Sequence, residues 1–328
     1  MAAVEADFLH KQLDERKLRL ETAIALAPLD ANLAALLHEV DSALDKFANG
    51  TYGLCENCHD SVERDRLLAD PLIRYCLDHL SKPERAALQR DLDLASDLQR
   101  SLLPPADLKS AGWETSYHYA PIGPVSGDYC DLYPCPDGHL FFMLGDVSGK
   151  GVAASMRMTQ LHALFRSLIR MGLSLAEIIE HINRFLCDSA LAGQYATLVC
   201  GRANAGGNVE LFNAGHLPVI VAGQDGARLI ESTGLPLGMF HEAAFTPAHL
   251  CLGKGDMLFL YTDGVSEARG ADEEFGIDRL LRLAAGQPSS TACGLVSACL
   301  NELRGFAGTQ PGLDDVTLLA ILHSGEAA

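Results

Sequence analysis

Three apolar runs of this sequence begin or end beside an aspartate, and a fourth aspartate stands in a Gly-Asp pair. The three are Asp146, Asp263 and Asp314, and the fourth is Asp128. Short apolar runs bounded by turn residues are typical of buried strands, and the run 140–144 before Asp146 is of this kind. We therefore expect these carboxylates at strand ends, at the rim of a sheet, where a ligand can reach them.

Carboxylates that gather beside a packed sheet lose hydration and repel one another, so each holds its proton more tightly unless a cation joins them. A divalent metal ion resolves this conflict. Because the predicted ligands are all oxygen atoms, hard ions such as Mg²⁺ or Mn²⁺ fit this site better than zinc or copper does. The sequence therefore predicts a divalent-metal centre built from distant parts of the chain.

A second constellation combines three cysteines and a histidine. Cys55-x2-Cys58 and Cys76-x2-His79 are two ligand pairs separated by 17 residues. This is the spacing of a zinc ribbon, and Cys3His is a known tetrahedral ligand set. The segment around them is rich in charged residues and poor in apolar ones, so a bound metal ion would stabilise its fold in place of a hydrophobic core. We expect one structural zinc ion here.

Strand and helix patterns alternate in pairs after residue 112. Strands are expected at 113–120, 127–133, 140–147, 196–202, 209–213, 219–221, 256–261 and 316–322, and helices at 153–171, 175–191, 277–285 and 291–306. Pairs of strands followed by pairs of helices suit an α+β fold in which two sheets pack face to face with helices outside.

The first hundred residues show helical patterns on both sides of the cysteine segment. Two helices are expected within residues 4–49, with a break at Pro28 and a cap at Asp30, and a third from Lys82 to Leu103. The first two should form a hairpin. The third follows the four-and-three spacing of a short coiled coil at Leu88, Leu92, Ala95, Gln99 and Leu102; a plain helix packed on its own domain is the alternative.

Composition narrows the class of protein. The chain has 328 residues and a net charge of −18 that is spread along its length, which disfavours direct binding of nucleic acid or of a membrane surface. The sequence shows no apolar segment long enough for a signal peptide or a membrane span. Most cysteines stand singly in apolar runs, as reduced cysteines do. We expect a soluble, cytoplasmic protein.

Six motifs in a fixed order resemble the SpoIIE-like branch of the metal-dependent protein phosphatases, within the protein phosphatase 2C-like superfamily. They are GDYCD, GDVSGKG, NAGHLP, GLPLG, YTDG and DDVT, and the resemblance covers residues 113–323. It implies an α-β-β-α sandwich that hydrolyses phosphoserine or phosphothreonine on a regulatory protein, by family analogy a STAS-domain anti-anti-sigma factor. It also implies a dimerising or signal-transmitting linker, and we expect a homodimer through the N-terminal and linker helices.

Hydrolysis of a phosphomonoester needs a nucleophilic water and neutralisation of the phosphoryl oxygens, and two metal ions about 3.5–4 Å apart supply both. We expect Asp146 to bridge two Mn²⁺ or Mg²⁺ ions with help from the Val147 carbonyl, and Asp263 to bind at least one of them. Asp314 would complete the second site, and Asp128 matches the family's other acidic position. Asp146 and Asp263 are thus the predicted catalytic residues.

The segment from Gly50 resembles the DksA/TraR-type zinc finger in the motif GTYGLCENC. It departs from that family at His59, where glycine is usual, and at His79, where the fourth cysteine is usual. We expect a helical hairpin at 1–49, this finger at 50–81, a linker helix at 82–105 and a phosphatase domain at 106–328.

The finger also supports an alternative function. Members of its family use a helical hairpin to enter RNA polymerase, so this chain could be a zinc-finger interaction protein of the transcription machinery that keeps the phosphatase fold as a scaffold. The complete set of four aspartates favours the phosphatase, with the zinc module as its gate.

Two further residues have side chains that are suited to catalysis. His216, in the turn NAGH, is placed to give a proton to the leaving hydroxyl, although a histidine in a tight turn more often bonds the backbone. Lys150 follows Gly149 as in a P-loop, but Gly145 lies too near for the motif G-x4-G-K-[ST], and Gly151 replaces Ser or Thr. A nucleotide-binding role is therefore rejected.

Overall fold

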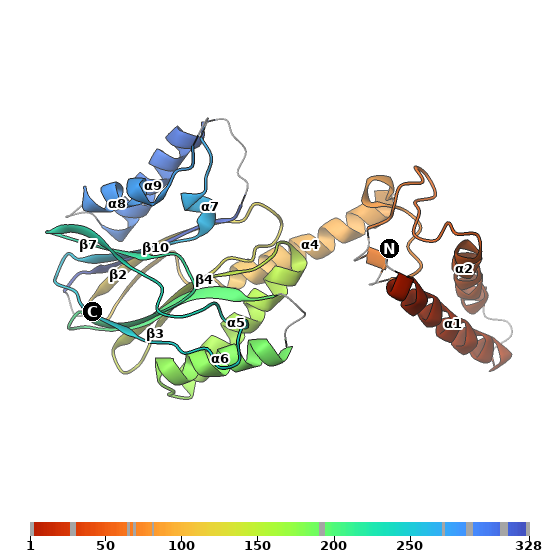
Figure 1. Cartoon of the computed structure of the whole chain (residues 1–328), viewed down its shortest axis with the longest axis horizontal. Coiled ribbons are helices and arrows are strands. Elements are labelled where there is room, and N and C mark those ends of the chain that lie inside the picture. Colours follow the sequence, from red (N-terminus) through yellow and green to blue (C-terminus); the bar gives the residue numbers. More distant parts are fainter. Residues whose placement is uncertain are drawn as a thin grey trace. The chain divides into compact units, whose positions relative to one another are not determined.

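The computed structural model (Figure 1) describes residues 3–26, 31–63, 66–67, 70–80, 82–189, 194–270, 273–286, 291–308 and 314–325. The chain divides into two compact units, Met1–Asp91 and Leu92–Ala328. Within the described ranges no helix is long and apolar enough to cross a membrane. The predicted helix break at Pro28 and cap at Asp30 lie outside these ranges.

Two antiparallel sheets form the centre of the larger unit. The six-stranded sheet has the order β1-β2-β11-β10-β7-β8, and the five-stranded sheet has the order β3-β4-β5-β6-β9. The strands of the first are β1 (Asp107–Ser110), β2 (Trp113–Ala120), β7 (Val219–Gly223), β8 (Gly226–Ile230), β10 (Met257–Tyr261) and β11 (Val316–His323). Those of the second are β3 (Tyr129–Pro134), β4 (His139–Val147), β5 (Ala196–Asn204), β6 (Asn208–Ala214) and β9 (Ala248–Cys251).

Helices cover the outer face of each sheet, as Figure 1 shows. They are α5 (Val152–Arg170) and α6 (Leu175–Ser189) on the five-stranded sheet, and α8 (Ile277–Ala285) and α9 (Ala292–Ala307) on the six-stranded sheet. In β4, Phe142 and Leu144 point into the core between the sheets, whereas Phe141 and Met143 pack in the core under α5 and α6. A strand buried on both faces reads as a continuous apolar run. The predicted α-β-β-α sandwich is confirmed.

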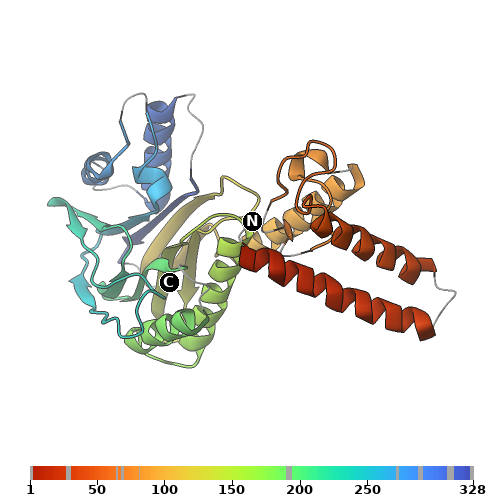
Figure 2. The same ribbon diagram turned by 45° about the vertical axis from the view of Figure 1, so that its right-hand side comes forward.

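The N-terminal unit begins with two antiparallel helices, α1 (Ala3–Leu26) and α2 (Ala31–Ala48), which lie side by side in Figure 2. Leu13 of α1 packs against Val40 and Ala43 of α2, and all three side chains are buried. The spacing of three between the two α2 residues places them on one face of the helix. The predicted hairpin is confirmed.

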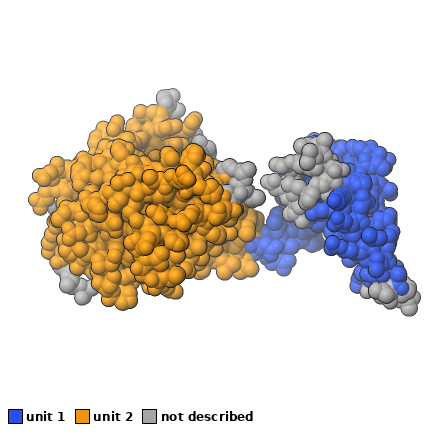
Figure 3. All heavy atoms as spheres, turned by 60° about the horizontal axis from the view of Figure 1, so that its bottom comes forward, with its two compact units in different colours: residues 1–91 blue, residues 92–328 orange. Residues whose placement is uncertain are grey.

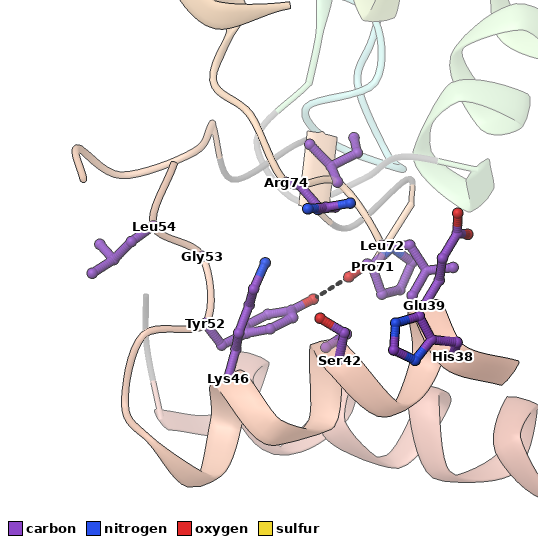
Figure 4. A pocket seen from close by; sticks show the side chains of 12 residues that line it. His38, Glu39, Ser42, Lys46, Tyr52, Gly53, Leu54, Pro71, Leu72 and Arg74 are labelled. Atoms are coloured by element: carbon purple, nitrogen blue, oxygen red, sulfur yellow. Dashed lines mark hydrogen bonds between the residues drawn. The ribbon is translucent and has the colours of Figure 1, made fainter. Parts of the chain in front are cut away.

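The zinc-finger segment packs on α2 around a small pocket of about 110 Å³ (Figure 4). Glu56 of the finger accepts hydrogen bonds from Lys46 of α2 and from Arg74, and the cations hold the pKa of this carboxyl down at about 2. Tyr52 stacks on Phe47 with ring centroids 3.7 Å apart. Finger and hairpin therefore share charged and aromatic contacts.

Helix α4 (Lys82–Leu102) contains the boundary between the two units, which Figure 3 colours separately. Leu94 and Leu98 on this helix are 60% and 61% exposed, but Gln99 is only 4% exposed and is hydrogen-bonded to Ser126. Gln99, a position of the predicted coiled-coil seam, thus belongs to the core of the larger unit. Pairing of α4 with a second copy stays a prediction.

Candidate active site

The pairing of β3 with β4 brings two of the predicted aspartates together. Tyr129 lies opposite Gly145, so that Asp128 and Asp146, one residue before and one after this pair, are neighbours across the two strands. The approach is close, because a Cβ added to Gly127 would lie 3.3 Å from Asp146 Oδ1. A glycine at this position lets the backbone before β3 reach the carboxylate.

The pairing of β10 with β11 brings the other two aspartates together. The last residue of β10 pairs with the third residue of β11, so Asp263, two residues after β10, and Asp314, two before β11, lie at the same end of the sheet. A Cβ on Gly264 would overlap the carbonyl oxygen of Asp315. Only glycine allows the short helix α7 (Asp263–Ser266) to start this close to the neighbouring segment.

Asp146 and Asp263, the two predicted catalytic residues, come from different sheets but line one pocket of about 300 Å³. Ser148, Thr197 and His216 contribute polar groups to the same pocket. The pocket lies where the ends of the two sheets meet. The two carboxylates therefore share one cavity, as residues that bind a common pair of ions must.

The carboxylates strongly perturb one another. Burial, followed by repulsion from Asp263 and Asp314, raises the pKa of Asp146 to about 7. Burial and then Asp314 also raise the pKa of Asp263. Lys150 compensates part of this charge, since its Nζ lies 2.8 Å from Asp314 Oδ2. Raised carboxyl pKa values in a cavity are typical of sites that hold cations or catalyse reactions.

Asp128 does not line this pocket and is only 2% exposed. Its Oδ2 accepts hydrogen bonds from the hydroxyls of Thr262, at 2.8 Å, and Thr317, at 2.5 Å. Burial raises the pKa of this carboxyl well above its usual range. The sequence patterns did not identify these two threonines. Thr317 could have been noticed as a hydroxyl inside an otherwise apolar strand, and Thr262 as a hydroxyl directly before Asp263.

Asp315 fixes the backbone beside the pocket. Its carboxylate accepts hydrogen bonds from the Ile122 N–H at 2.7 Å, the Gly127 N–H at 3.3 Å and the Ser126 hydroxyl. Because these donors come from the loop before β3, Asp315 ties that loop to the start of β11. Its side chain is thus engaged with the protein, next to the predicted ligand Asp314.

His216 is nearly buried and uses both ring nitrogens within the protein. Nε2 lies 3.0 Å from the Tyr261 carbonyl oxygen and Nδ1 lies 2.8 Å from Thr197 Oγ1. A carbonyl can only accept, so Nε2 carries the proton and Nδ1 accepts from the threonine hydroxyl. Burial lowers the pKa of His216 to about 4. This arrangement favours the backbone-bonding interpretation over proton donation.

The oxygen donors of the pocket fit hard divalent cations. Carboxylates with raised pKa values, crowded at one cavity, have the chemistry that such an ion stabilises. In the described part of the chain, no three of these aspartates bring ligand atoms within 4.8 Å of one another. This spacing is compatible with a pair of ions, because ligands that are shared out between two ions about 3.5–4 Å apart lie farther from one another than the ligands of a single ion do. The predicted ligands remain Asp128, Asp146, Val147, Asp263 and Asp314.

The four predicted zinc ligands do come together. One ligand atom from each of Cys55, Cys58, Cys76 and His79 lies within 4.8 Å of all the others. The Sγ atoms of Cys58 and Cys76 are 3.8 Å apart, and Cys76 Sγ is 3.2 Å from His79 Nδ1. A tetrahedral zinc with Zn–S of about 2.3 Å requires sulfur atoms about 3.8 Å apart. The set therefore fits a zinc ion, with the short helix η1 (Leu77–His79) presenting the histidine.

Comparison with known families agrees with this geometry. The family described as stage II sporulation protein E (SpoIIE) matches residues 136–323, more than half of the chain. The prokaryotic dksA/traR C4-type zinc finger matches residues 50–78. His79 lies just beyond that match, and a histidine as fourth ligand departs from the C4 type.

Curated relatives and a solved structure resemble the same region. Protein IcfG of Synechocystis is 30% identical over 71% of this chain and 42% of its own length, and phosphoserine phosphatase RsbP of Bacillus subtilis is 28% identical over 55% and 46%. This chain therefore spans less than half the length of either relative. The crystal structure of the RsbU and RsbW domains of Rv1364c from Mycobacterium tuberculosis shares 28% identity, with a TM-score of 0.59 over 68% of this chain and 63% of that one. The chain belongs to the stage II sporulation protein E (SpoIIE) family and also carries a dksA/traR-type zinc finger.

Proposed function

We propose that this protein is a metal-dependent protein serine/threonine phosphatase that hydrolyses phosphoserine or phosphothreonine on a regulatory protein. The observation that carries the proposal is the convergence of Asp146, Asp263 and Asp314 at one end of the two sheets, with the pKa of Asp146 raised to about 7 by burial and by the other two acids. The similarity to RsbP, a phosphoserine phosphatase, supports the same reaction.

In this proposal Asp146, Asp263 and Asp314 hold two divalent cations, Mn²⁺ or Mg²⁺, with Asp128 and the Val147 carbonyl completing the ligand set. When bound, these ions supply a nucleophilic water at neutral pH and neutralise charge on the phosphoryl oxygens. Asp146 would be the ligand shared by the two ions, because its pKa is raised by burial and by the charges of both Asp263 and Asp314.

The remaining residues of the pocket orient these groups. Thr262 and Thr317 hold one oxygen of Asp128, which fixes the direction of its carboxylate. His216 stays neutral at physiological pH and donates Nε2–H to a backbone carbonyl, so it shapes the pocket wall and gives no proton to the leaving hydroxyl.

The substrate that we propose is a phosphorylated STAS-domain anti-anti-sigma factor, by analogy with the family. In this proposal the zinc module regulates the phosphatase activity through the linker helix. The chain then divides into a hairpin at 1–49, a finger at 50–81 that holds one zinc ion, a linker at 82–105 and a phosphatase domain at 106–328. A homodimer through the N-terminal and linker helices is part of this proposal. The exposure of Leu94 and Leu98 on α4 supports it.

Hydrolysis of a phosphoserine peptide and of p-nitrophenyl phosphate, with and without Mn²⁺, tests the proposal. We expect Mn²⁺-dependent activity that falls by about 100-fold in Asp146→Asn, because the substitution removes the negative charge of a predicted metal ligand. Asp225→Asn is the matched control, since this exposed aspartate lies in the turn between β7 and β8. Activity retained by Asp146→Asn would rule out the proposed site.

A further inference from the structure

Helix α4 contributes a buried polar side chain to the larger unit. The Gln99 amide makes both backbone hydrogen bonds of Ser126, because Nε2 donates to the carbonyl at 2.7 Å and Oε1 accepts from the N–H at 3.0 Å. Ser126 is fully buried and Gln99 is 4% exposed. A buried amide paired in this way fixes the loop before β3 to the helix, and breaking the pair leaves buried polar groups unsatisfied.

The hydroxyl of Ser126 extends this contact to the aspartates. Its Oγ donates to Asp315 Oδ2 and accepts from the Asp128 N–H at 2.9 Å. Asp128 is in turn a predicted metal ligand, and the intervening Gly127 lies against the Asp146 carboxylate. A displacement of Ser126 therefore moves the backbone that carries Asp128.

We propose that Gln99 is a positioning residue of the metal site, which couples helix α4 to Asp128 through Ser126, so that the position of α4 sets the cation affinity of the pocket. This inference rests on the proposed function and deepens it by naming a regulatory contact. The boundary between the two units lies within α4, so any rearrangement of the N-terminal unit that shifts this helix reaches the site by this route. Gln99 itself touches neither substrate nor cation.

Calorimetric titration of the zinc-loaded, full-length protein with Mn²⁺ tests the coupling. We expect Gln99→Leu to bind Mn²⁺ about 10- to 100-fold more weakly than the wild type, the range typical of lost partners behind a metal ligand. Gln89→Leu makes the same chemical change at an exposed position of the same helix and should keep the affinity within about twofold. A residue that only stabilises the fold would lower the unfolding midpoint without this selective loss of affinity.

A double-mutant cycle with Ser126→Ala makes the test specific. If Gln99 acts through Ser126, the two substitutions interrupt one path, and the double variant should lose little more affinity than the weaker-binding single variant. Losses that simply multiply, or an affinity of Gln99→Leu equal to that of Gln89→Leu, would overturn the inference. Should Gln99→Leu fail to fold, Gln99→Glu, which keeps the acceptor for the Ser126 N–H, replaces it under the same criteria.

The two proposals can fail separately. If the wild type binds no Mn²⁺, the proposed function fails and takes the inference with it. If the wild type binds Mn²⁺ and hydrolyses the phosphopeptide but Gln99→Leu binds equally well, the coupling alone is wrong.

Discussion

Replacing Asp146 by asparagine should make the metal-free protein more stable at pH 8. Burial and the neighbouring acids raise the pKa of Asp146 from 3.8 to about 7, so the folded state holds this proton more tightly than the unfolded state does. For an acid with a raised pKa, stability is present below pH 4 and is lost as the pH rises through about 7. An asparagine at this position carries no charge that must be desolvated, so this decrease in stability with rising pH is removed.

The magnitude follows from the shift in pKa. Each tenfold change in proton affinity corresponds to about 1.4 kcal/mol, so a pKa moved from 3.8 to about 7 corresponds to at most about 4 kcal/mol at pH 8. We expect a gain of about 2–4 kcal/mol, since asparagine also loses some native contacts. For a domain of this size the gain corresponds to roughly 5–15 °C in Tm. At pH 5 the gain should shrink to about 1–2 kcal/mol, because the carboxyl is then protonated in the folded state.

The assay uses Trp113, the single tryptophan of the chain, which is buried in β2 and so reports the unfolding of the larger unit alone. Thermal unfolding of wild type and Asp146→Asn is followed by its fluorescence at pH 5 and pH 8 without added Mn²⁺. Equal midpoints at pH 8, or a gain that is the same at both pH values, would refute the electrostatic account of the pocket. Asp225→Asn should change neither midpoint.

Three further outcomes are expected. Cys58→Ser should lose the zinc that the wild type retains through dialysis, measured by elemental analysis; full zinc content would contradict the finger. Arg166→Ala leaves Asp131 buried without its bidentate partner, and a drop of about 3–5 kcal/mol in unfolding free energy is expected by denaturant titration, against little change if the pair is dispensable. His216→Gln should lessen the fall in Tm between pH 6.5 and 4, because the buried imidazole, with its pKa lowered to about 4, resists protonation in the folded state; an unchanged slope would oppose this.

The sequence predicted the strands and helices with strong apolar patterns. The run that forms β4 and the helix α8 were both found, because burial on one or two faces imposes a readable pattern. The strands β1, β8 and β9 were missed. They are four or five residues long and largely half-exposed, so no apolar run distinguishes them from a loop.

The candidate site was predictable in part for a similar reason. Asp146 and Asp263 stand beside apolar runs and inside recognisable motifs, and these features identified them. Gln99 and Thr317 gave no such signal, since each acts through a hydrogen bond to a residue 27 or 189 positions away along the chain. Such pairs depend on the register and packing of the folded sheets, which local patterns do not encode. Gln99 was instead assigned to a helix seam, because periodicity alone cannot distinguish a seam from a buried face.

Anomalous scattering from crystals grown with Mn²⁺ and Zn²⁺, recorded at both absorption edges, tests the central claim most directly. We predict two manganese peaks between Asp146, Asp263 and Asp314, and one zinc peak among Cys55, Cys58, Cys76 and His79. Manganese peaks elsewhere, or an aspartate pocket without manganese when Mn²⁺ is in excess, would contradict the proposal that these distant carboxylates form a metal-dependent phosphatase site.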